Sequence, residues 1–125
     1  MREKIAKNFY RDEFECKCGC GFDSVDAMLV HGLQRLRDIM QAPVHINSGC
    51  RCAAHNATLD NSSTKSQHTL GKAADIRVSG YTPEETLDFA KMLSEFADSG
   101  IGIYDTFVHL DVRKGRARWD YRTKK

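Results

Sequence analysis

The segment "SQHTLGKAAD" (66–75) places a histidine and an aspartate seven positions apart, with a glycine and two alanines between them. Imidazole nitrogens and carboxylate oxygens are both good zinc ligands. His68 lies in a polar loop, whereas Asp75 lies in the run "AADIRVS", whose alternation of apolar and polar residues predicts a β-strand. The two side chains could therefore contribute to a metal site if the fold supplies a third ligand.

A third candidate ligand lies in "FVHLDVR" (107–113), which also alternates strictly. Alternation puts His109 and Asp111 on one face of this strand, and its valines and leucine on the other. If the apolar faces of both strands cover the same core, Asp75 and His109 emerge together on the open face of the sheet. The loop that enters the first strand can then bring His68 within reach.

Two neutral imidazoles and one carboxylate would hold Zn2+ and leave a fourth position for water, which is the pattern of catalytic zinc sites. Small neighbours fit this interpretation, because Gly71 lets the loop turn back and Ala73 leaves the space beside Asp75 unfilled. A single histidine on a strand is more often a surface or packing residue. The prediction therefore depends on His68 and His109 converging on the same carboxylate.

The five cysteines are an odd number, which excludes complete disulfide pairing within one chain. They form two clusters, "CKCGC" (Cys16, Cys18 and Cys20) and "CRC" (Cys50 and Cys52). The clusters could meet around a structural zinc, although Cys-x-Cys is tighter than the usual finger spacing. Free or partly paired thiols are the alternative.

Two helices are predicted from apolar periodicity. The first runs from Ser24, a plausible N-cap, to Gln41. The second opens at "TPEE" with Thr82 as N-cap and a capping box, and runs to about Ala97, with Met92 among its buried residues.

The strands predicted are "PVHIN", "AADIRVS", "GIGIY", "FVHLDVR" and a last segment near "ARW", and residues 48–72 are expected to form a long loop. Strands and helices alternate too little for a doubly wound sheet. The pattern predicts an α+β fold, with a small antiparallel or mixed sheet and helices on one face.

A chain of 125 residues with 41% hydrophobic content fits one domain over residues 1–125. Residues from about 113 to 125 hold seven basic residues against one acid. They predict either a solvated, partly frayed tail or an electrostatic handle for an anionic polymer such as a bacterial cell wall. The net charge of +2 is too small to argue for nucleic acid, and no nucleic-acid partner is expected.

No apolar run is long enough to cross a membrane, and the start "MREKIAKNFYRDEF" lacks the apolar centre of a signal peptide. We therefore expect no membrane partner, a monomer, and a protein that is cytoplasmic as synthesised.

Three ordered motifs resemble the zinc D-Ala-D-Ala carboxypeptidase family, which includes phage L-alanyl-D-glutamate endopeptidases and is related to lysostaphin-like peptidases and the hedgehog domain. "SQHTLGKAAD" matches its Ser-x-His-x-x-Gly-x-Ala-x-Asp signature, "INSGCRCAAHN" is similar to its Ser-Gly-x-Arg segment, and "FVHLDVR" to its second metal motif. The opening "DEFECKCGCGFDSVDAMLVHGLQRLRD" resembles the phage-type branch, so the resemblance covers nearly the whole chain.

The resemblance implies a mostly antiparallel sheet with helices packed on one face and a zinc site, held by His68, Asp75 and His109, on the other. It also implies that Arg51 binds peptide or carboxylate oxygens of the substrate, for which a guanidinium is suited. A structural ion pair is the alternative role for Arg51. Ser66 would orient the substrate or a neighbouring ligand, or would be an ordinary loop hydroxyl.

The sequence departs from the family at the general base. Other branches have a histidine, glutamate or aspartate two or three positions before the last ligand, where this chain has Phe107 and Thr106. Asp111 is one candidate base, and could instead fix an imidazole. Asp105 is the other, if a bulge aims it inward, and could instead be a turn residue.

The function expected from this resemblance is zinc-dependent hydrolysis of peptide stems or cross-links of bacterial peptidoglycan, of carboxypeptidase or endopeptidase type. A phage or prophage lysin released to the cell wall, or a virion-associated part, would suit the short chain. The alternative is a non-catalytic, hedgehog-like zinc module, which the missing upstream base favours.

Overall fold

The computed structural model describes residues 3–57 and 66–123. Its centre is a five-stranded sheet in the order β3-β4-β6-β5-β7, in which only the β5–β7 pair is parallel. The strands of this sheet are β3 (Val44–Ser48), β4 (Ala73–Val78), β5 (Gly100–Ile103), β6 (Val108–Asp111) and β7 (Ala117–Asp120). A separate hairpin consists of β1 (Lys4–Ala6) and β2 (Phe9–Tyr10). The helices are α1 (Ala27–Met40), α2 (Ala53–Ala57), α3 (Pro83–Ala90) and α4 (Ser94–Ala97), with 3-10 turns η1 (Arg11–Phe14) and η2 (Gln67–Leu70).

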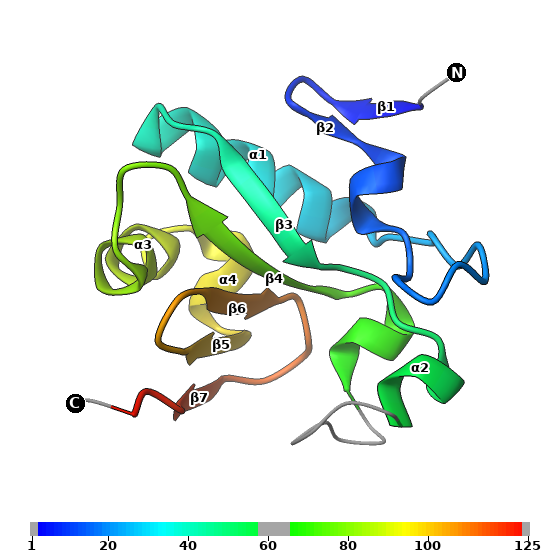
Figure 1. Ribbon diagram of the computed structural model, residues 1–125. Coiled ribbons are helices and arrows are strands. Elements are labelled where there is room, and N and C mark those ends of the chain that lie inside the picture. The colour runs from blue at the N-terminus through cyan, green and yellow to red at the C-terminus, as the bar shows by residue number, and fades with distance from the viewer. Residues whose placement is uncertain (1–2, 58–65, 124–125) are drawn as a thin grey trace.

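Helices α1, α3 and α4 cover one face of the five-stranded sheet (Figure 1). The core between the two layers includes Leu29, Leu33 and Leu36 of α1, together with Ile76 of β4 and Leu110 of β6. These are the apolar positions that the helical and strand periodicities assigned to the core. The predicted α+β class, with a small, mostly antiparallel sheet and helices on one face, is confirmed.

Helix α1 begins later than predicted. Its N-cap is Asp26, whose carboxylate accepts a hydrogen bond from the Met28 backbone N–H at 2.8 Å, and Ser24 lies outside the helix. The chain is held in place before the helix because the Asp26 backbone N–H donates to the Gly71 carbonyl at 2.8 Å. A tertiary contact thus sets this boundary.

The helix predicted from Thr82 to about Ala97 is two helices. The capping box of Thr82 and Glu85 is present, but α3 ends at Ala90, and Leu93 is extended before α4 begins. The break lets Leu93 and Phe96 enter the core, whereas Met92, expected to be buried, is 70% exposed. Packing of α4 against α1 is therefore favoured over continuation of α3 as one longer helix.

The expected loop 48–72 contains α2 and η2, and residues 58–65 of it lie outside the described part of the chain. The basic segment from about residue 113 is not a frayed tail where it is described, because residues 117–120 pair with β5 as β7. Arg118 and Arg122 are anchored as well: Arg118 donates to the carbonyls of Ala97 and Ser99, and Arg122 pairs with Glu84. No helix of the described residues combines the length and the apolarity needed to span a membrane.

Candidate metal centre

His68, Asp75 and His109 meet on the sheet face opposite the helices, and we refer to them as the His–Asp site. Asp75 of β4 and His109 of β6 are directly paired across the antiparallel ladder, and His68 comes from η2, immediately before β4. One ligand atom from each residue lies within 4.8 Å of the others. The structure thus brings together all three residues that the motifs single out, and both imidazoles are buried.

Local structure holds His68 in one orientation. The Ser66 hydroxyl caps η2 by accepting from the His68 backbone N–H at 3.2 Å. Gly71 then ends the turn with φ 69°, and a Cβ there would overlap the carbonyl oxygen of Ser24. The Nδ1 of His68 lies 2.6 Å from the Gly49 carbonyl oxygen, so Nδ1 carries the proton and Nε2 faces Asp75 as an acceptor.

His109 lies between two carboxylates. Its Nδ1 is 3.0 Å from Asp75 Oδ1, and its Nε2 is 2.8 Å from Asp111 Oδ2. Asp111 is completely buried and also accepts from the Gly100 backbone N–H at 2.8 Å and from the Arg113 guanidinium at 2.7 Å. This chain of contacts fixes the ring of His109 and directs Nδ1 toward Asp75.

The donor set fits a divalent cation. A neutral imidazole with its proton on Nδ1 would present a lone pair on Nε2 to the Asp75 oxygen 3.2 Å away, which is unfavourable unless a cation or a proton lies between them. His109 has the same requirement, because a neutral imidazole has one N–H and both of its nitrogens face carboxylate oxygens. A zinc ion would be held by His68 Nε2, Asp75 and His109 Nδ1, with Asp111 orienting the second imidazole.

The electrostatics agree with this arrangement. Burial opposes ionisation of Asp75, but its close contacts with the His109 and His68 rings hold the pKa of its carboxyl well below the usual range. Burial also opposes protonation of His109, yet the carboxylates of Asp111 and Asp75 raise its pKa above the ordinary value. Asp75 is therefore ionised, which is the state in which a carboxylate binds a cation.

The two candidate bases lie in different surroundings. Both oxygens of Asp111 are occupied by His109, Gly100 and Arg113, which favours a role in fixing the imidazole. Asp105 is exposed in the β5–β6 connection, and its carboxylate accepts from the backbone and hydroxyl of Thr123. The structure thus places Asp105 outside the cluster of ligand atoms.

Arg51 and Ser66 lie together beside the site. The Arg51 guanidinium donates to the Ser66 hydroxyl at 3.2 Å, and its backbone N–H donates to the His68 carbonyl at 3.0 Å. Burial lowers the pKa of Arg51, and the nearby carboxylate of Asp75 opposes this change. Its buried Nε has no partner among the described residues. Arg51 is therefore a half-buried cation next to the candidate metal position, with hydrogen-bonding capacity left over.

An aromatic group that the sequence reasoning missed borders the site. The Trp119 ring lies 4.9 Å from that of His109, and its indole N–H donates to the Tyr104 hydroxyl at 3.0 Å. Tyr104 in turn stacks on Phe107 at 4.3 Å. These residues form a wall beside His109.

Glycines make room for that wall. Gly102 of β5 pairs with His109 on one side and Trp119 on the other, and a Cβ there would overlap the indole. Gly100, two residues earlier, leaves the space that Asp111 and Arg113 fill. The isoleucines of "GIGI" face the core, so its glycines lie on the polar face of the sheet. These glycines were the sequence signal that could have indicated large side chains packed beside His109.

The cysteines separate into two groups. The Sγ atoms of Cys16, Cys18, Cys20 and Cys52 lie within 4.8 Å of one another, and we call these residues the thiol cluster. Cys50 is buried in the hydrophobic core instead.

Two imidazoles and a carboxylate, with Asp75 and His109 on adjacent strands and His68 on a 3-10 turn, form the ligand set that is typical of zinc-dependent hydrolases. Comparison with protein families agrees, because residues 7–111 match the family described as Peptidase M15. The chain therefore belongs to the M15 family of zinc D-Ala-D-Ala carboxypeptidases, and is a metallopeptidase by family. A comparison with curated proteins finds no match.

Proposed function

We propose that the protein is a zinc-dependent peptidase that hydrolyses peptide stems or cross-links of bacterial peptidoglycan, as a carboxypeptidase or an endopeptidase. The observation that carries this proposal is the convergence of His68, Asp75 and His109 in a chain of the M15 family. Neighbouring Arg51, with an unpartnered donor, supports a substrate that carries peptide or carboxylate oxygens.

Zinc, when bound, would polarise the scissile carbonyl and lower the pKa of a coordinated water to about 7. The protein's own groups prepare this chemistry. The Gly49 carbonyl keeps the proton of His68 on Nδ1, so that Nε2 is available as a ligand. Asp111 does the same for His109 by accepting from Nε2. Asp111 would therefore act on the imidazole and not on the attacking water.

Arg51 would bind the anionic or carbonyl oxygens of the substrate, because a guanidinium stays charged and offers paired donors. Ser66 would keep the guanidinium in place through the contact at 3.2 Å. The basic segment after Arg113 would favour approach to an anionic wall polymer. We also propose that the protein is a phage or prophage lysin that reaches the cell wall after synthesis in the cytoplasm.

A non-catalytic zinc module is the second candidate. It is favoured by the occupied oxygens of Asp111, since this carboxylate is not available to take a proton from water.

Digestion of purified peptidoglycan distinguishes the two candidates. The zinc-loaded protein is incubated with peptidoglycan, with and without a chelator, and new amino termini are measured and the products identified by mass. Chelator-sensitive release of stem peptides or of terminal D-alanine supports the peptidase. Zinc binding without any new termini supports the module. Retained hydrolysis by a His109→Ala variant whose His–Asp site contains no zinc would refute the mechanism.

A further inference from the structure

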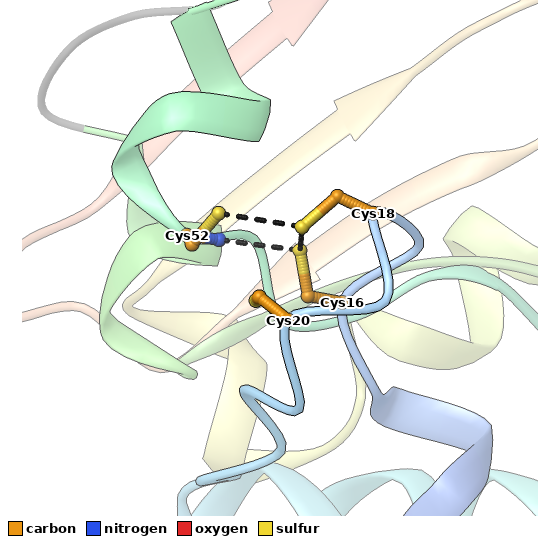
Figure 2. Close-up of side chains that lie close together, drawn as sticks. All are labelled: Cys16, Cys18, Cys20 and Cys52. Atoms are coloured by element: carbon orange, nitrogen blue, oxygen red, sulfur yellow. Dashed lines mark hydrogen bonds between the residues drawn. The ribbon is translucent and has the colours of Figure 1, made fainter.

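The thiol cluster gathers cysteines from two distant parts of the chain. Cys16, Cys18 and Cys20 lie in the loop after η1, and Cys52 lies just before α2 (Figure 2). The Sγ atoms of Cys16 and Cys18 are 3.4 Å apart, and those of Cys18 and Cys52 are 3.6 Å apart. These distances are too long for disulfide bonds, which need about 2.05 Å.

The same distances suit a tetrahedral metal centre. Four sulfurs about 2.3 Å from a zinc ion are about 3.8 Å from one another, close to the observed separations. The backbone N–H of Cys52 also points at Cys16 Sγ, at 3.4 Å, and such a donor stabilises a thiolate. A set made only of thiolates selects zinc or iron over magnesium or calcium.

The backbone around the cluster is shaped to hold it. The Gly19 N–H donates to the Cys16 carbonyl at 3.2 Å and closes a turn, and Gly19 itself has φ 83°. The Cys50 N–H donates to the Phe14 carbonyl at 2.7 Å, which ties the two cysteine-bearing segments together. Gly49 packs directly on the backbone of Phe14. A Cβ at position 49 would lie only 2.8 Å from the Phe14 Cα, so this contact requires glycine.

The loop needs such a link. No residue from 15 to 25 is in a helix or strand, and Cys18 and Cys20 are exposed. Exposed thiols are open to oxidation, whereas ligation would protect them. Residues 17–21 are all exposed, so this part of the loop lacks the buried apolar surface that could hold it without another source of stability.

We propose that Cys16, Cys18, Cys20 and Cys52 bind a structural zinc ion, separate from the His–Asp site. All four coordination positions are filled by protein sulfur, so this ion has no place for water or substrate. On binding, the thiols lose their protons to the solvent. The ion clamps the N-terminal loop to residues 49–52, and through them supports Gly49 and Arg51, which contact His68.

Cobalt substitution tests this proposal without using enzyme activity. Reduced, metal-free protein is titrated with Co2+, and thiolate-to-cobalt charge-transfer absorption is recorded. The unaltered protein should show this absorption, zinc should displace it, and in the Asp75→Asn variant it should saturate at one ion per chain. The Cys18→Ser and Cys20→Ser variants, altered at exposed positions, should weaken this binding by at least about 100-fold, since even the loss of a hydrogen-bonding partner of a ligand costs about 10- to 100-fold.

Two matched variants complete the experiment. Cys50→Ala removes the cysteine outside the cluster and should keep the absorption, and Asp75→Asn should keep it while losing metal from the His–Asp site. Metal analysis of the zinc-loaded protein should give two zinc ions per chain, and one in either the Cys20→Ser or the Asp75→Asn variant. The proposal is overturned if no thiolate absorption appears, if Cys18→Ser and Cys20→Ser leave it unchanged, if the purified cluster contains iron, or if Cys18 and Cys52 form a disulfide. Because the absorption reports sulfur ligation, it is independent of whether peptidoglycan is cleaved.

Discussion

The His–Asp site and the thiol cluster both gather candidate metal ligands, but they do so in different ways. Asp75 and His109 are held by the register of two adjacent strands, and His109 is supported from behind by buried Asp111. The thiol cluster lies in irregular backbone, with two of its members exposed. The first site is positioned by the fold, whereas the second would position part of the fold.

This difference indicates what each site can do. A site positioned by a rigid sheet can leave one coordination position open to water, because its geometry does not depend on the ion. A site in a loop with little buried surface needs all four ligands to be protein groups, because the ion supplies the stability. We therefore expect loss of the first metal to remove activity and loss of the second to loosen the structure.

Asp75→Asn should have the largest effect on activity. The substitution keeps the shape of the side chain but removes the charge that faces both imidazoles. Hydrolysis of peptidoglycan should fall by at least about 100-fold, because a ligand matters more than the groups that orient it. Release of amino termini measures the loss, with circular dichroism as the control for folding. Full activity in this variant would show that Asp75 is not a metal ligand.

Asp111→Asn should have the next largest effect. It weakens the acceptor for His109 Nε2 and the ion pair with Arg113, so zinc affinity at the His–Asp site should drop by about 10- to 100-fold. Competition with a chromophoric chelator measures this affinity, and the cobalt–thiolate absorption should not change. Unchanged zinc affinity together with lost hydrolysis would instead identify Asp111 as the general base.

Gly102→Ala tests the dependence of the His–Asp site on the sheet. A Cβ at this position would overlap the Trp119 indole, which lies against His109, so overpacking should cost up to about 3 kcal/mol in the free energy of unfolding. Urea denaturation gives this value. The thiol cluster should still bind cobalt normally.

The double variant Gly102→Ala/Trp119→Ala is the matched control for this clash. It should be no less stable than Trp119→Ala alone, because the added methyl group then meets no indole. Equal costs of Gly102→Ala with and without Trp119 would show that the clash is not the cause.

Glu95→Gln should have the smallest effect and should spare both sites. Burial opposes the ionisation of Glu95, but its hydrogen bonds, including those from Arg35 and His31, lower its pKa overall. Its contribution to stability is therefore complete above the unfolded pKa of about 4.3 and is lost as the pH falls through the lower, folded pKa. We expect a loss of about 1.5 kcal/mol at pH 7.

Urea denaturation at several pH values checks this prediction. The difference between the parent protein and Glu95→Gln should shrink below about pH 4, where the glutamate becomes protonated. A difference that stays constant down to pH 2 would contradict the role given to the charge. Metal content at neutral pH should be the same in both proteins.

The sequence predicted the fold class and which faces of the strands are buried. Strict alternation in "AADIRVS" and "FVHLDVR" was enough to put Ile76 and Leu110 in the core. It was not enough to place helix ends, because Asp26 is held by Gly71 and Leu93 is drawn into the core by contacts distant in sequence. The wall of Tyr104 and Trp119 was missed because it also depends on contacts distant in sequence. Strand β7 pairs with β5 in parallel, and no sequence pattern between the two strands indicates this pairing.

The amino-acid sequence by itself determined the chemistry of the ligands: imidazoles, a carboxylate and thiols at spacings that strands and tight loops can present. The tertiary structure decided which of them meet. Strand register set the pairing of Asp75 with His109, and the contact between Phe14 and Cys50 selected Cys52, and not Cys50, for the cluster. The physical reason is that alternation fixes the direction of a side chain along its own strand, whereas the distance between ligands depends on packing among segments far apart in the chain.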